Sequence, residues 1–164
     1  MKSTLLIVLT AISFVAFAQI DKKERTGEPD IYSVEGDDKE MNEAIKKSRL
    51  TFDTFLTTFK NKKGNQTGFS VKMPFPTNDG AEHIWLVNIE SKEGKLFGQV
   101  DNVPESVTSI RLGDKIEIDR NKISDWFYVE DNKLIGGLTI RVIRDRMSPA
   151  EKRQFDREIG VKIE

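Results

Sequence analysis

Residues 69–100 read FSVKMPFPTNDGAEHIWLVNIESKEGKLFGQV, and this stretch decides the fold class. Apolar and polar side chains alternate over residues 69–75, which is typical of a β-strand with one face toward a core. Residues 84–89 are apolar on both faces apart from one asparagine, so they predict a central strand covered on each side. The turn sequence of residues 92–95 leads back into residues 95–100, which predicts a hairpin.

Three further short strands are predicted downstream of the hairpin, at residues 115–119, 125–130 and 138–142. No helical pattern lies between any two strands, so we expect an antiparallel sheet without helical crossovers. Five or six short strands hide their edges best when the sheet curls. The sequence therefore predicts a strongly bent antiparallel sheet or a partly open barrel.

Helices are predicted before and after the strands, which makes the fold class α+β. Residues 41–59 carry an apolar stripe with a helical period, and Asp37 with Glu40 forms a capping-box pattern in front of it. The phenylalanines of this stripe are expected to seal one side of the sheet. They are Phe52, Phe55 and Phe59. A short C-terminal helix is predicted to begin at Ser148 and to end at Gly160.

The N-terminal residues have the organisation of a secretory signal peptide. A charged start at Lys2 precedes an apolar run, and Ala16 and Ala18 provide small residues at a cleavage site. The alternative is an uncleaved anchor helix, but the apolar run is short for a membrane span, which needs about 20 apolar residues. We therefore predict a signal peptide over residues 1–18, cleaved after Ala18. The mature protein is expected to be periplasmic or secreted, with no membrane span.

Two segments follow the predicted cleavage site. Residues 19–30 are dominated by charge, with glycine and proline, and such a composition cannot bury enough apolar surface to order itself. We expect them to form a flexible tether. Residues 31–164 are expected to form a single domain, since that length is enough for one apolar core.

Charge and cysteine content exclude several classes of protein. The chain has 26 basic and 27 acidic residues and a formal net charge of −1. It lacks the excess of lysine and arginine that releases counterions from nucleic acid, so no nucleic-acid partner is predicted. The absence of cysteine excludes disulfides, thiolate metal sites and a cysteine nucleophile. We predict no metal site and no cofactor, since no glycine-rich phosphate loop is present either.

His83 and the tryptophans are the first candidates for a functional site. His83 is the only histidine, so it cannot build a multi-histidine metal site, but it could act as a general base. Asp125 precedes Trp126, and Glu82 lies near Trp85, and an acidic group beside an aromatic ring suits sugar binding. The alternative is that each tryptophan lies in the core and each acidic residue at the surface.

Asp114, Asp125 and Arg141 are polar residues inside otherwise apolar motifs. Asp114 and Asp125 stand at strand starts, where a carboxylate can accept hydrogen bonds from loop amides. Arg141 is expected on the outward face of the strand at residues 138–142. There it could pair with an aspartate across strands or bind an anionic partner. We favour structural roles for these residues and for His83, with a shared binding site as the alternative.

Several motifs occur in an order that resembles the YegJ-like family, a bacterial domain of unknown function (domain of unknown function 2314). They are residues 41–59, 82–85, 98–104, 112–114, 123–126 and 136–141. The resemblance covers about residues 31–144. It implies no catalytic residues, because the members of the family are largely uncharacterised.

The sequence as a whole favours a non-catalytic binding or interaction module, possessing neither a nucleophile elbow nor a phosphate loop. A protein in the cell envelope is the expected partner. The alternative function is an envelope hydrolase that uses acidic residues near Trp85 or Trp126. The candidate residues for a binding site are His83, Trp85, Asp114, Asp125, Trp126 and Arg141.

Overall fold

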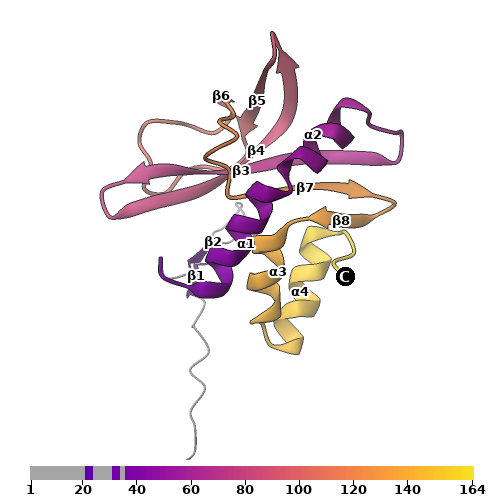
Figure 1. The fold of residues 1–164 in the computed structure, drawn as a ribbon. Coiled ribbons are helices and arrows are strands. Elements are labelled where there is room, and N and C mark those ends of the chain that lie inside the picture. Colours follow the sequence, from indigo (N-terminus) through magenta and orange to yellow (C-terminus); the bar gives the residue numbers. More distant parts are fainter. Residues whose placement is uncertain (1–20, 24–30, 34–35) are drawn as a thin grey trace, which may run out of the picture.

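A computed structural model describes residues 21–23, 31–33 and 36–164, and it shows a mixed α+β fold (Figure 1). The predicted signal peptide at residues 1–18 lies outside the described residues. So does most of the predicted tether, although residues 21–23 of that segment form a strand. The helices are α1 Lys39–Leu50, α2 Phe52–Lys60, α3 Leu138–Asp145 and α4 Pro149–Ile159.

A six-stranded antiparallel sheet forms the centre of the fold, with the strand order β6-β5-β4-β3-β7-β8. Its strands are β3 Gln66–Thr77, β4 Gly80–Lys92, β5 Lys95–Val100, β6 Lys115–Glu117, β7 Asp125–Glu130 and β8 Lys133–Gly136. β6 and β8 are its two edges, so the sheet is not closed into a barrel. The strands β1 Asp21–Lys23 and β2 Ile31–Ser33 pair separately with each other.

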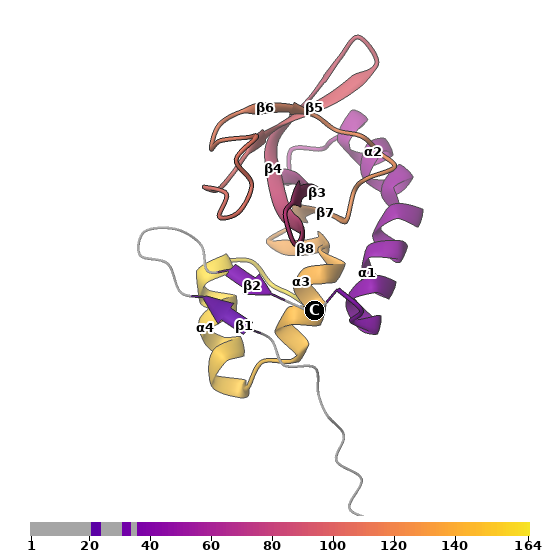
Figure 2. The same cartoon turned by 90° about the vertical axis from the view of Figure 1, so that its left-hand side faces the viewer.

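Strand register assigns the two faces of the sheet. Val71 pairs with Leu86 and Met73 pairs with Ile84, and all four side chains are buried. Successive residues of a strand point to opposite faces, so Trp85, between two buried residues, points away from this core. Figure 2 shows α1 and α2 along one side of the sheet.

The core is rich in aromatic rings contributed by α2, β3 and β7. Phe55 is fully buried, and its ring lies 5.3 Å from the Phe52 ring and 5.7 Å from the Trp126 ring. It also meets Phe69 edge to face, at 5.6 Å between centroids. Such pairs add to the free energy that area burial alone provides. The phenylalanine stripe of the sequence is therefore the side of α2 that packs on the sheet.

The single helix predicted over residues 41–59 is wrong, because the chain forms two helices that meet at Thr51. In an unbroken helix the Ser48 carbonyl would accept a hydrogen bond from the amide four residues later. It instead accepts hydrogen bonds from Trp126 Nε1 at 2.9 Å and from Thr51 Oγ1 at 3.3 Å. These competing donors mark the point where α1 ends. The predicted cap is also displaced by one residue, since Asp38 Oδ1 accepts from the Met41 amide at 2.9 Å.

The strand predicted at residues 138–142 is wrong as well, because these residues begin α3. The alternating apolar residues suggested a period of two, whereas the buried side chains are Thr139 and Ile143, four residues apart. Gly137 adopts φ +62° and turns the chain out of β8 into the helix. The sequence signals at the end of the chain are read correctly, since Ser148 and Glu151 form a capping box and Gly160 ends α4.

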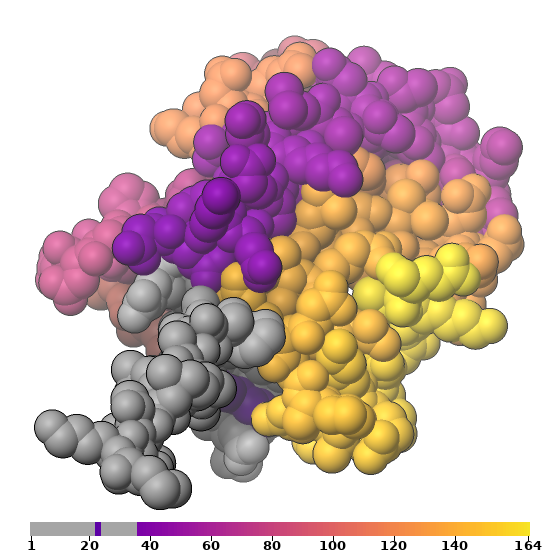
Figure 3. All heavy atoms as spheres, turned by 60° about the horizontal axis from the view of Figure 1, so that its bottom comes forward, coloured from indigo at the N-terminus to yellow at the C-terminus, as the bar shows by residue number. Residues whose placement is uncertain are grey.

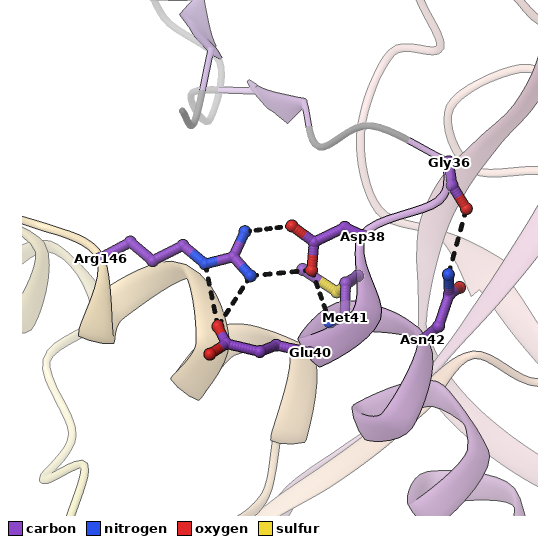
Figure 4. Close-up of polar contacts among 6 residues, drawn as sticks. All are labelled: Gly36, Asp38, Glu40, Met41, Asn42 and Arg146. Atoms are coloured by element: carbon purple, nitrogen blue, oxygen red, sulfur yellow. Dashed lines mark hydrogen bonds and ion pairs between the residues drawn. The ribbon is translucent and has the colours of Figure 1, made fainter. Parts of the chain in front are cut away.

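An ion cluster joins the start of α1 to the end of α3 (Figure 4). The Arg146 guanidinium donates to both oxygens of Asp38, at 2.6 and 2.8 Å, and to Glu40 at 2.8 Å. The Asp38 side chain is 2% exposed and that of Arg146 is 10% exposed, whereas Glu40 is open to solvent. Figure 3 shows the purple atoms of α1 beside the orange atoms of α3. The cluster therefore fastens two helices that are distant in sequence.

This ion cluster predicts an acid-dependent stability. The hydrogen bonds from Arg146 lower the pKa of Asp38 below its ordinary value of 3.8. A lowered carboxyl pKa stabilises the fold above the pKa of the unfolded chain, and this contribution is lost as the pH falls through the folded value. Arg146→Met should cost roughly 3 kcal/mol at pH 7, because it leaves a buried charge unpaired. In urea unfolding, the difference from wild type should shrink below about pH 4.

The exposed ion pair of Arg120 with Asp53, at 2.9 Å, supplies the matched control. Arg120→Met should change the free energy of unfolding by less than about 1 kcal/mol, as is usual for surface pairs. An Arg146→Met difference that stays constant down to pH 2 would show that the Asp38 contact does not stabilise the fold through charge.

Candidate functional site

A row of polar and aromatic side chains crosses the sheet on the face turned away from the Val71 core. In the strand register Lys72 pairs with Trp85 on β4 and with Asp125 on β7. The Lys72 ammonium lies 5.4 Å from the centre of the Trp85 ring, within cation–π range. Phe127 meets Trp85 edge to face, with ring centroids 4.9 Å apart. We call Lys72, His83, Trp85 and Phe127 the Lys72 surface.

The Lys72 surface is partly open to solvent. Lys72, Trp85 and Phe127 are half-buried, while His83, two residues before Trp85 on the same face, is exposed. The His83 imidazole forms no hydrogen bond with any of the residues that the structure describes. Its ring nitrogens are thus available to solvent or to a ligand.

Two cations, Lys72 and Arg49, act on His83, and the Asp125 carboxylate acts on Lys72. Burial lowers the pKa of Lys72, and the Asp125 carboxylate opposes this effect. The pKa of His83 lies below its ordinary value of 6.5. The main cause is that the surrounding protein removes part of the water that would stabilise the imidazolium, and the second is that Lys72 and Arg49 repel its charge. Arg49 itself is anchored, with Nε 2.7 Å from the Ile123 carbonyl oxygen.

Asp125 is fully buried, and its carboxylate is occupied by structural contacts. Oδ1 accepts from Ser48 Oγ and from the amides of Trp126 and Leu138, at 2.8 to 3.1 Å. Oδ2 accepts from the amide and the hydroxyl of Thr139, at 2.8 and 2.7 Å. The carboxylate therefore caps α3 and ties α1 to β7, and all of its partners are donors.

Glu82 is likewise engaged by the backbone. Its carboxylate accepts from the amides of Glu105, Ser106 and Val107, at 2.9 to 3.3 Å. This arrangement holds the loop after β5 against β4. Together with the contacts of Asp125, it places both acidic candidates in structural roles.

The other sequence candidates do not join the Lys72 surface. Trp126 is 5% exposed and lies in the core beside Phe55. Asp114 Oδ2 accepts from the Arg111 amide at 2.8 Å and closes a turn. Of the predicted site residues, the structure therefore brings together His83 and Trp85, with Asp125 at the end of their row.

Arg141 lies on α3, so its predicted place on the outward face of a strand is wrong. Its guanidinium donates to the Gly136 carbonyl at 3.0 Å, to the Leu134 carbonyl at 2.8 Å, and to the Glu164 carbonyl. It therefore holds the C-terminal residues beside β8, where Leu134 and Lys162 also share a backbone hydrogen bond of 2.8 Å.

Sequence reasoning missed two components of the site, Lys72 and Phe127, and the nearby cation Arg49. The alternation Val71-Lys72-Met73 shows that Lys72 faces away from the core. The pairing of Lys72 with Trp85 depends on register, however, and the sequence does not specify it.

Two negative observations apply to the described part of the chain. No three histidine or acidic side chains there gather closely enough to hold a metal ion. None of the helices in these ranges has the length and apolar composition that a membrane crossing requires.

Comparisons with known proteins identify the family. Residues 38–163 match the model of DUF2314, described as an uncharacterized protein conserved in bacteria. The chain is 33% identical over 140 residues to the uncharacterized protein YegJ of Escherichia coli, covering 85% of each chain. It is 30% identical over 143 residues to a putative ankyrin repeat protein of Neisseria meningitidis, covering 82% of this chain and 56% of that protein. No solved structure matches. The chain therefore belongs to the YegJ-like DUF2314 family of bacterial proteins.

Proposed function

We propose that the protein is a non-catalytic binding module that engages a partner in the cell envelope through the Lys72 surface. The observation that carries this proposal is the half-exposed Trp85–Phe127 pair with the Lys72 ammonium beside it. Tryptophan is among the residues that most often anchor a protein partner, and aromatic side chains are enriched at interfaces. The name of the Neisseria relative, an ankyrin repeat protein, supports a protein partner.

The acidic candidates for an envelope hydrolase give that alternative no support. General acid–base catalysis needs a carboxyl group within reach of the substrate. Asp125 has no exposed surface, and the Glu82 carboxylate is held by backbone amides. Binding without chemical change is therefore the function that these contacts favour.

Capture from envelope extract tests the binding function. Immobilised wild type should retain a partner that Trp85→Leu does not, and the partner should be recovered with its mass unchanged. Phe97→Ala is the matched control, since Lys115 lies 5.3 Å from the Phe97 ring in a similar pair elsewhere on the sheet. Thermal melts establish that both variants fold. Equal capture by Trp85→Leu, or a partner recovered in cleaved form, would contradict the proposal.

The proposed site of action is outside the cytoplasm, following cleavage after Ala18. The full chain with a C-terminal tag should be found in the periplasmic or secreted fraction, with Gln19 as its first residue. A cytoplasmic protein that retains Met1 would contradict this part of the proposal.

A further inference from the structure

We propose that the Lys72 surface recognises an acidic peptide segment, whose carboxylate lies between Lys72 and His83 and whose apolar side chain packs on Trp85 and Phe127. This inference rests on the proposed binding function and adds the chemistry of the partner. It follows from two cations without ion-pair partners among the described residues, beside two half-buried aromatic rings.

The positive charge at this surface is not neutralised by the described residues. Neither Lys72 nor Arg49 forms an ion pair with a carboxylate in that part of the chain. Asp125, the carboxylate nearest to Lys72 in the register, is saturated by five donors. The Asp125 carboxylate therefore attracts the Lys72 ammonium at a distance but forms no ion pair with it.

Lys115 shows what an internally neutralised lysine looks like on the same sheet. It also lies over an aromatic ring, that of Phe97, but its ammonium is ion-paired with Glu90. Lys72 has the ring without the carboxylate. A ligand carboxylate at Lys72 would take the place that Glu90 takes at Lys115. A half-buried ammonium gains most from such a charged acceptor.

Asp101 does not fill that position. Its amide donates to the Trp85 carbonyl at 3.1 Å, which places it next to the Lys72 surface. Burial raises the pKa of the Asp101 carboxyl group, and no ion pair joins it to Lys72 or to another cation among the described residues. An acidic residue paired with Lys72 would have a lowered pKa instead.

His83 provides a direct reporter for the experiment, because it is the only histidine in the chain. Its imidazole proton signals can be followed by NMR through a pH titration without further assignment. The probe is a capped tetrapeptide of alternating phenylalanine and aspartate, and its matched control contains asparagine in place of aspartate. The acidic peptide should bind and raise the pKa of His83, because a nearby carboxylate favours the imidazolium. The asparagine peptide should bind at least about tenfold more weakly.

Lys72→Met tests the position of the charge. In the free protein it should raise the pKa of His83, because it removes a repelling cation. It should also weaken the acidic peptide about tenfold or more, whereas Lys115→Met should leave both quantities unchanged. Thermal melts establish that the variants fold.

Three outcomes are decisive. Equal binding of the acidic and asparagine peptides would overturn the acidic specificity while leaving the binding function in place. The same His83 response to sodium acetate as to the acidic peptide would show an anion site that does not recognise a peptide. Binding of neither peptide, together with capture of a partner that depends on Trp85, would overturn this inference alone.

Discussion

Gly136→Ala is expected to destabilise the protein by about 2–6 kcal/mol, since a strained backbone costs about 1–3 kcal/mol and overpacking adds roughly as much. Gly136 has φ +82°, and a Cβ there would meet the Trp126 carbonyl oxygen directly and two Trp126 ring carbons at 2.7 and 2.8 Å. The carbonyl cannot move away freely, because it accepts the Gly137 amide at 2.8 Å. Urea unfolding followed by tryptophan fluorescence measures the loss.

Gly64→Ala is the matched control for this substitution. Gly64 has no positive φ, and its added Cβ would meet no atom within 4 Å. Its free energy of unfolding should stay within about 0.5 kcal/mol of wild type, as for other surface changes. A Gly136→Ala protein as stable as Gly64→Ala would mean that β7 and β8 do not approach each other as described.

Asp125→Asn is expected to cost about 3–5 kcal/mol although the two side chains have nearly the same shape. Every hydrogen-bond partner of Asp125 is a donor. An asparagine can accept through only one of its two terminal atoms, and its NH₂ group would face donors. Unsatisfied buried donors cost roughly 1–3 kcal/mol each.

Denaturant unfolding of Asp125→Asn beside Asp53→Asn separates this effect from a general loss of charge. Asp53 is an exposed residue of α2, and its replacement should change the free energy of unfolding by less than about 1 kcal/mol. If Asp125→Asn falls in the same range, Asp125 does not hold α1, β7 and α3 together.

Local sequence signals predicted those elements whose ends are determined by neighbouring residues. β5 and β7 have the predicted bounds, because Gly94 and the pair Asp131 and Asn132 adopt positive φ in the adjoining turns. The capping box of Ser148 likewise marks the start of α4. In each case the residues that terminate the element are its neighbours in sequence.

The errors arose where the deciding contact comes from a distant residue. α3 is capped by Asp125, which precedes Leu138 by 13 residues, so the cap that marks this helix start is not among its neighbours in sequence. The end of α1 is set by Trp126, a residue 78 positions from Ser48. The candidate site has the same limitation, because Lys72 meets Trp85 only through the register of β3 with β4.

The attachment of α1 has a consequence for the order in which the chain can fold during synthesis. Ser48 binds Asp125 across 77 residues, and Asp38 binds Arg146 across 108. Contacts of such separation must overcome loop-closure entropy, so they form late and slow folding. As the chain emerges from the ribosome, α1 therefore exists for most of that time without its docking surface. The apolar stripe that runs through α1 and α2 is then open to a chaperone until β7 and α3 have been made.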